Sequence, residues 1–138
     1  MTDKDQEKKL KEAYMEYQVM QQTVQQLQKQ IETVQEQLQE VSQISENIQN
    51  MKEIKKDTEL LVPVANGIFL KTKLADNNDL VVNVGSNTVV KKSFPQVYEM
   101  LGKQQKDMED MYTQLLVQFQ GLHTKSQELE QHIQKLAQ

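Results

Sequence analysis

The first third of the chain carries apolar residues at alternating steps of three and four. The series runs Leu10, Ala13, Tyr17, Met20, Val24, Leu27, Ile31, Val34, Leu38 and Val41. Polar residues occupy most positions between them, and a heptad pattern over four or more repeats indicates a coiled coil. After Val41 the rhythm slips, because Ile48, Met51 and Ile54 follow at two successive three-residue steps, which locally overwinds a coiled coil. The pattern predicts one helix over about residues 5–56, roughly 75–80 Å long.

The last third repeats the heptad pattern more regularly. One series falls seven residues apart: Leu101, Met108, Leu115, Leu122, Leu129 and Leu136. A second series lies between these positions: Tyr98, Gln105, Tyr112, Phe119, Ser126 and Ile133. Ser93 and Gln96 have the spacing of a capping box, and Pro95 is tolerated in a first helical turn. The sequence therefore predicts a second coiled-coil helix over residues 93–138.

Residues 58–92 have strand-like patterning instead. Two apolar runs, 60–64 and 68–74, flank Asn66-Gly67, which between such runs is a strong hairpin signal. A second pair of runs, 80–84 and 88–91, flanks a turn at residues 85–87. Pro63 cannot donate a hydrogen bond to a neighbouring strand, so we expect its strand at an edge or at a bulge. The segment predicts two β-hairpins.

The order helix, two hairpins, helix predicts a mainly α fold with a small β insert. In the simplest arrangement a long antiparallel coiled-coil hairpin carries the two β-hairpins at its bend. Its parts are an N-terminal helix over 1–57, the hairpins over 58–92 and a C-terminal helix over 93–138. Ile31 and Val34 should then lie opposite residues 115–119, with both chain termini at the far tip.

Composition narrows the function. The 138 residues carry a net charge of −4, with 16 Lys, no Arg and no Cys. The absence of Cys excludes disulfides and thiolate chemistry, and an acidic chain without Arg is unlike a nucleic-acid binder. No stretch approaches the ~20 apolar residues of a membrane span, and the charged N-terminus does not resemble a signal peptide. We expect a cytoplasmic protein without nucleic-acid or membrane partners.

The residues that could carry chemistry do not assemble into a catalytic or metal-binding motif. His123 and His132 are nine residues apart, which places them on opposite faces of a helix. The stretch Asp76-Asn77-Asn78-Asp79 lacks the spaced acidic ligands of a calcium loop and is better interpreted as a turn. The sequence predicts no enzyme, no cofactor and no metal site.

The hairpins carry more apolar residues than this chain can cover. At about 25 cal/mol per Å², leaving several hundred Å² exposed forgoes several kcal/mol and invites edge pairing. We therefore expect the hairpins to pair with those of other subunits; the alternative is that they pack only on each other as a small capping sheet. The expected assembly residues are Leu61, Val62, Val64, Ile68, Phe69, Leu70, Val81, Val82, Val84, Val89 and Val90.

The layout resembles prefoldin. The specific matching segments are Leu61-Val62-Pro63-Val64 within the insert 59–71, and Val82-Asn83-Val84-Gly85-Ser86 in the second hairpin. Two hairpins rather than one resemble the alpha-type subunit, and residues 14–19, Tyr-Met-Glu-Tyr-Gln-Val, resemble the start of archaeal alpha subunits. The heptad helices add little alone, since all coiled coils look alike.

The resemblance implies a hexamer of two alpha-type and four beta-type subunits, whose hairpins build a double β-barrel. The coiled coils would hang from this body as tentacles. Such complexes capture non-native proteins at the tentacle tips without ATP and pass them to a group II chaperonin. The resemblance provides no catalytic residues and transfers only the location of client binding, the tips.

The sequence offers candidate apolar residues near that tip. Tyr14, Met15 and Val19 project away from the seam, whereas others lie on it; exposed apolar patches mark interaction sites, although ordinary seam packing is the alternative for any single residue. The candidate client-binding residues are Leu10, Tyr14, Met15, Tyr17, Val19, Leu129, Ile133 and Leu136. Two other functions remain: a structural coiled-coil tether, and a filament-forming relative of prefoldin.

Overall fold

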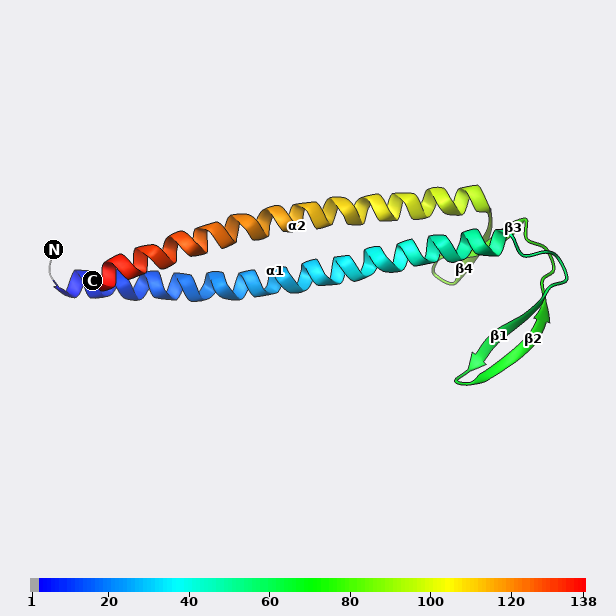
Figure 1. Ribbon diagram of the computed structural model, residues 1–138, viewed down its shortest axis with the longest axis horizontal. Coiled ribbons are helices and arrows are strands. Elements are labelled where there is room, and N and C mark those ends of the chain that lie inside the picture. The colour runs from blue at the N-terminus through cyan, green and yellow to red at the C-terminus, as the bar shows by residue number, and fades with distance from the viewer. Residues whose placement is uncertain (1–2) are drawn as a thin grey trace. The chain divides into compact units, whose positions relative to one another are not determined.

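The computed structural model describes residues 3–138. It contains two long helices with two β-hairpins between them in sequence (Figure 1). The elements are α1 (Asp3–Lys52), β1 (Glu59–Ala65), β2 (Ile68–Lys73), β3 (Asp79–Gly85), β4 (Thr88–Ser93) and α2 (Phe94–Ala137). This order confirms the predicted fold class. The chain divides into two compact units: the arm unit, up to Leu38 and from Asp107 onward, and the hairpin unit, Gln39–Lys106.

The arm unit is an antiparallel helix pair. Two side-chain hydrogen bonds join its helices: Gln21 Nε2 donates to Ser126 Oγ at 2.6 Å, and Gln35 Nε2 donates to Tyr112 Oη at 3.0 Å. The bonded positions advance along α1 and retreat along α2 by the same number of residues, which fixes the antiparallel register. Figure 1 shows the start of α1 and the end of α2 at the same end of the pair, as the predicted antiparallel arrangement requires.

The core of the arm unit is narrow. Its buried residues are Ala13, Val24, Leu27 and Val34 from α1 and Ser126 from α2. Val34 and Leu115 line one groove between the helices, in agreement with the predicted register. Most of the remaining seam residues are half-buried, because each helix has only one neighbouring helix to pack against.

The hairpin unit has its own small core of Val41, Phe94, Val97 and Leu101. Beyond Val41 the seam of α1 opens, and Ile44 and Met51 are about half exposed.

Helix α1 ends at Lys52 rather than at the predicted residue 56. The side-chain amide of Asn77 donates to the carbonyl oxygens of Lys52 at 2.9 Å and Ile54 at 2.7 Å. These bonds satisfy carbonyl groups that a continuing helix would use internally. Asp57 then adopts a left-handed φ of 65°, and Thr58 Oγ1 donates to the Lys55 carbonyl at 2.6 Å. The last predicted turn is therefore an irregular connection held by the linker between the hairpins.

Helix α2 begins with the predicted capping box. The backbone N–H of Gln96 donates to Ser93 Oγ at 3.3 Å, and the backbone N–H of Ser93 donates to Gln96 Oε1 at 3.0 Å. The reciprocal bonds satisfy two backbone donors at the start of the helix. Phe94 and Val97 are buried beside the cap and tie this end of α2 to the hairpin unit.

The two hairpins have the same register, displaced by 20 residues. Glu59 pairs with Lys73 as Asp79 pairs with Ser93, and each hairpin has a register shift just before its turn. The shift between Pro63 and Ala65 confirms the bulge expected at the proline. The matching shift between Asn83 and Gly85 was not predicted, because no proline marks it.

The turns of the hairpins differ in backbone conformation. In the first, Gly67 has a φ of 75°, which glycine adopts without steric cost. In the second, Ser86 and Asn87 both have positive φ, 50° and 59°, as a type I′ turn requires. A left-handed serine is costly, so the second turn is the more strained.

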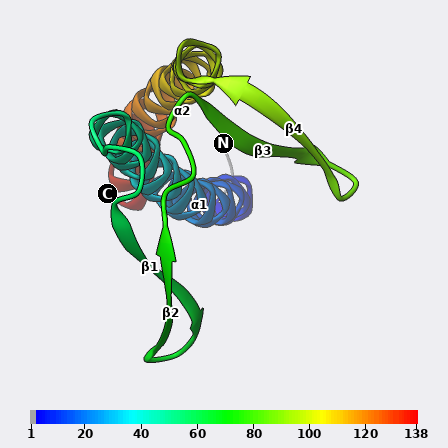
Figure 2. The ribbon, with the colours of Figure 1, turned by 90° about the vertical axis from the view of Figure 1, so that its right-hand side faces the viewer.

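Each hairpin forms its own two-stranded sheet. Within residues 3–138 no strand of one hairpin pairs with a strand of the other, and Figure 2 shows them as separate ribbons. The two therefore do not form a joint four-stranded sheet. Isolated two-stranded hairpins are marginal in water, so their stability depends on what covers them.

Candidate functional site

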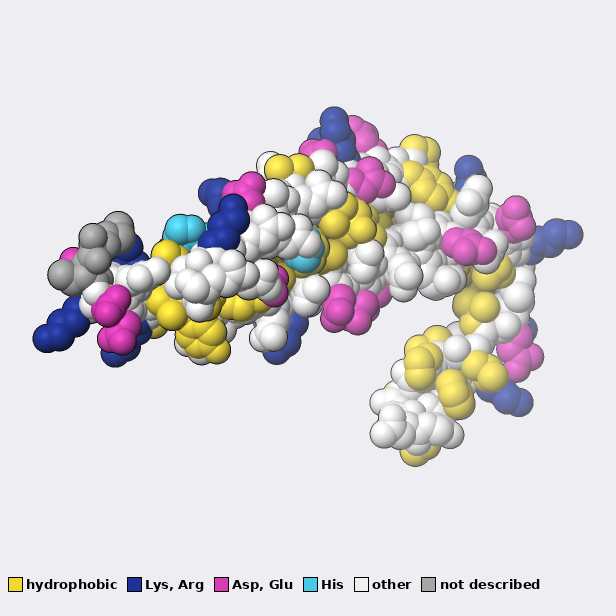
Figure 3. Space-filling view, turned by 60° about the vertical axis from the view of Figure 1, so that its left-hand side comes forward, with side chains coloured by type: hydrophobic (Ala, Val, Ile, Leu, Met, Phe, Trp, Pro, Cys, Tyr) yellow, Lys and Arg dark blue, Asp and Glu magenta, His cyan; other side chains and the backbone are white. Residues whose placement is uncertain are grey.

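The tips of the two helices in the arm unit enclose an open cleft of about 530 Å³. We call it the tip cleft. It is lined by Glu7, Leu10, Lys11, Tyr14 and Met15 of α1 and by Ile133 and Ala137 of α2. Figure 3 shows hydrophobic side chains gathered at this end of the arm, bordered by charged ones. Four of the predicted tip residues, Leu10, Tyr14, Met15 and Ile133, thus line one cleft.

The tip cleft exists because the seam loses its tight packing near the ends of the helices. Ala13 is the last buried α1 residue toward the N-terminus, whereas Leu10 and Ile133 are only half-buried. Tyr14 and Met15 flank the seam and are 54% and 57% exposed. A small residue at position 13 lets the helices approach, and the larger side chains beyond it are left facing outward. The result is an apolar surface that no residue of the described chain covers completely.

The other predicted tip residues lie around the tip cleft. Leu136 joins Leu10 in an adjoining depression that also contains Asp3, Gln6 and Glu7. Tyr17 and Leu129 are half-buried farther along the seam, and Val19 is 62% exposed but does not line the tip cleft. Packing in the seam accounts for Tyr17 and Leu129, while Val19 has no such explanation.

A second apolar surface lies on the hairpins. Of the eleven predicted assembly residues, Val82 is half-buried and the other ten are exposed; they are Leu61, Val62, Val64, Ile68, Phe69, Leu70, Val81, Val84, Val89 and Val90. We call these eleven residues the hairpin surface. Nothing in the described part of the chain covers it, in keeping with the excess of apolar residues noted from the sequence.

The hairpin surface is apolar on both faces of the strands. Directly opposed residues share a face, so Val62 with Leu70 lies on one face and Pro63 with Phe69 on the other. In the second hairpin the corresponding pairs are Val82 with Val90 and Asn83 with Val89. A partner that packs on one face of a hairpin would leave the other face exposed to solvent, so complete burial requires more than one partner element.

A smaller pocket of about 290 Å³ lies inside the hairpin unit. It is lined by Met51, Ile54, Leu60, Leu61, Val62, Leu74, Asp76, Asn77, Asp79, Leu80 and Phe94. Its polar lining residues are Asp76 and Asn77 of the linker and Asp79 at the start of β3, and its lining residues Leu61 and Val62 belong also to the hairpin surface. The pocket therefore belongs to the same apolar region.

Several of the residues considered for metal binding make structural contacts instead. Asn77 caps the end of α1, and Asp76 Oδ1 accepts a hydrogen bond from the Asn78 backbone at 3.1 Å. His123 stacks on Phe119, with ring centroids 5.9 Å apart, and its Nε2 lies 3.3 Å from Gln127 Nε2. Between residues 3 and 138 the structure shows no group of three or more His, Asp or Glu placed to hold a metal ion.

The sequence did not reveal Glu7, Lys11 and Ala137 as lining residues of the tip cleft. All three lie off the heptad seam, and their meeting depends on the register between the helices. The spacing of Lys4, Lys8 and Lys11 at steps of four and three was a usable signal, because it places three charges on one helix face. No helix in the described range is long and apolar enough to cross a membrane.

Comparison with known proteins agrees with the fold. Residues 20–138 match the family model described as Prefoldin subunit. Prefoldin subunit alpha of Methanobrevibacter smithii is 35% identical over 66 residues, which cover 48% of this chain and 45% of the relative. Prefoldin subunit alpha 1 of Methanocaldococcus jannaschii is 44% identical over 55 residues, 40% of this chain and 38% of the relative. The chain thus spans less than half the length of these two relatives.

Longer alignments extend the likeness at lower identity. Prefoldin subunit alpha of Thermofilum pendens is 25% identical over 118 residues, 86% of this chain and 92% of the relative. A filamentous prefoldin from Methanocaldococcus jannaschii, solved by cryo-electron microscopy, superposes with a TM-score of 0.73 at 18% identity and covers 88% of this chain and 98% of that one. At that identity the structural likeness concerns the fold alone. Because the family model covers most of the residues, including both hairpins and all of α2, the chain belongs to the prefoldin family.

Proposed function

We propose that this chain is an alpha-type prefoldin subunit that captures non-native proteins at its tip cleft without ATP. The observation that carries this proposal is the meeting of Leu10, Tyr14, Met15 and Ile133 in one open, largely apolar cleft. Exposed apolar patches of this kind serve as interaction sites, and methionine adapts to surfaces of varied shape. The names of the curated relatives, all alpha subunits, support the subunit type.

We further propose that the hairpin surface joins this chain to beta-type prefoldin subunits, in a hexamer of two alpha and four beta chains. The exposure of apolar residues on both faces of both hairpins supports an assembly role. Because the two hairpins have the same register, their apolar residues lie at equivalent positions and could contact other subunits in a similar way. Transfer of clients to a group II chaperonin in the cytoplasm completes the proposal.

The test compares two pairs of exposed apolar residues. Tyr14→Ser with Met15→Ser removes the outward wall of the tip cleft, and Met111→Ser with Val117→Ser removes residues of similar exposure elsewhere in the arm unit. The assembled complex is mixed with a denatured client diluted from guanidinium, and light scattering is recorded. We expect the tip variant to lose most of its suppression of aggregation and the control variant to keep it. Equal suppression by both would contradict the proposal.

The same experiment tests the structural tether. If the chain is only a tether, even the unchanged protein should not delay aggregation. A tether also does not explain why the apolar hairpin surface is exposed. The filament interpretation is not favoured, since the curated relatives are named alpha subunits. The native mass of the chain mixed with a beta-type partner separates a closed hexamer from an open series of masses.

A further inference from the structure

Six charged residues near the start of α1 form two groups of like charge in different sectors of the helix, whereas Lys9 lies beside the acidic group and Asp3 and Glu7 lie outside both. Lys4, Lys8 and Lys11 recur at steps of four and three, so they fall within a sector of about 60° on the helix. We call them the basic stripe. Asp5, Glu12 and Glu16 fall within a separate sector of about 40°, and we call them the acidic stripe. All six residues are exposed.

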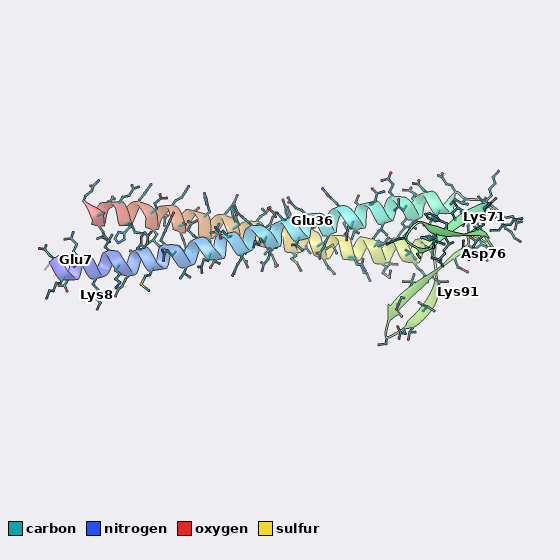
Figure 4. The ribbon with its side chains drawn as sticks, turned by 90° about the horizontal axis from the view of Figure 1, so that it is seen from below. Glu7, Lys8, Glu36, Lys71, Asp76 and Lys91 are labelled. Atoms are coloured by element: carbon teal, nitrogen blue, oxygen red, sulfur yellow. The ribbon has the colours of Figure 1, made fainter. Side chains whose placement is uncertain are left out.

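The basic stripe borders the tip cleft, whereas the acidic stripe does not. Lys11 is itself a lining residue, and Met15, another lining residue, lies in the same sector as the three lysines. No member of the acidic stripe lines the cleft. Figure 4 labels Glu7 and Lys8, neighbours in the chain that project to different sides of α1.

The carboxylate inside the tip cleft does not cancel this asymmetry. Glu7 lies four residues before Lys11, the arrangement in which a Glu–Lys pair on a helix is favourable. The three lysines still outnumber the carboxylates of Glu7 and of Asp3, which lines the adjoining depression. Helix α2 contributes only Ile133 and Ala137 to the lining, so it adds no charge to the cleft wall.

We propose, on the basis of the function proposed above, that the tip cleft prefers non-native segments in which an apolar stretch is flanked by acidic residues. The apolar side chains pack on Leu10, Tyr14 and Ile133, and the client's carboxylates lie along the basic stripe. From Lys4 to Lys11 the stripe is about 10 Å long, a length that an extended peptide spans with about three residues. Partners with a basic flank are repelled from the same border.

The test uses two synthetic peptides with one shared apolar core of Leu and Phe. One carries four Glu at one end and the other four Lys, and each bears an uncharged fluorescent dye. Their affinity for the assembled complex is measured by fluorescence anisotropy at 50 mM and 500 mM NaCl. We expect the acidic peptide to bind about tenfold more tightly at low salt, the order expected of three exposed charge pairs. The preference should shrink at high salt, because salt screens exposed charges.

The variant Lys4→Gln, Lys8→Gln, Lys11→Gln should abolish the preference and keep binding of a third peptide with four uncharged Ser. The matched control, Lys29→Gln, Lys103→Gln, Lys125→Gln, removes three exposed lysines elsewhere and should keep the preference. Equal affinity for the acidic and basic peptides, or a preference that survives in the first variant, would overturn the inference alone. Failure of all three peptides to bind would overturn the proposed client binding as well.

Discussion

Asn77 should be the most important single residue of the linker between the hairpins. Its side-chain amide donates two hydrogen bonds, to the carbonyl oxygens of Lys52 and Ile54, across more than 20 residues of sequence. Asn77→Ala removes both donors and leaves two carbonyl groups at the end of α1 without them. Both lengths, 2.9 and 2.7 Å, are those of well-formed bonds.

The cost follows from the usual net contribution of a hydrogen bond. At about 0.5–1.5 kcal/mol each, with partial rescue by water at a half-buried site, the two bonds together contribute about 1–2 kcal/mol. A chain of this size loses about 1.5–2 kcal/mol of stability per molar urea, so the unfolding midpoint should fall by roughly 0.5–1 M. Circular dichroism of the assembled protein in increasing urea measures this midpoint.

The adjacent residue offers a matched control. Asn78 is exposed and contributes its backbone N–H, not its side chain, to the bond with Asp76. Asn78→Ala should therefore leave the midpoint within about 0.2 M of the unchanged protein, since surface substitutions cost little. If the two variants unfold at the same urea concentration, the amide of Asn77 is not what ends α1.

Three further sets of variants test other parts of the structure. Ser126→Ala should lower the free energy of unfolding by about 1 kcal/mol by removing the partner of Gln21, and the double variant with Gln21→Leu should recover part of that loss. Urea midpoints of Ser126→Ala, Gln21→Leu and the double variant measure the coupling. Asn87→Gly should raise the free energy of unfolding and Gly67→Ala should lower it, each by about 1 kcal/mol or less, because both positions have positive φ; the melting temperatures from calorimetry should shift in the same directions. Phe69→Ser, at a side chain 57% exposed, should leave helix content unchanged by circular dichroism but lower the mass of the complex in native mass spectrometry.

The helices and hairpins could be predicted because each has a local signal. Heptad spacing marked α1 and α2, Ser93 with Gln96 marked the start of α2, and Asn66-Gly67 marked a turn. These signals involve residues within a few positions of one another, and the structure keeps all of them.

Features that depend on distant residues were not visible in the sequence. The Lys52 carbonyl at the end of α1 accepts a hydrogen bond from Asn77, which the sequence presents only as part of a polar turn. The bulge before Gly85 has no proline to announce it, unlike the one after Pro63.

The candidate site was predictable only where its residues have a local signal on one helix. Tyr14 and Met15 could be recognised as off-seam apolar residues from spacing on one helix. Glu7 and Ala137 join them only through the register between the helices, which depends on interactions such as the bond between Gln21 and Ser126.

Client capture at the tip cleft can be measured by site-specific photo-crosslinking to an unfolded client. A benzophenone amino acid replaces Tyr14 in one protein and Val117, an exposed apolar residue outside the tip cleft, in another. Each assembled complex is irradiated with a denatured client, and the covalent products are counted by mass spectrometry. If clients bind in the tip cleft, crosslinks should be abundant from position 14 and few from position 117. Equal yields from the two positions, or more from position 117, would contradict client binding in the tip cleft.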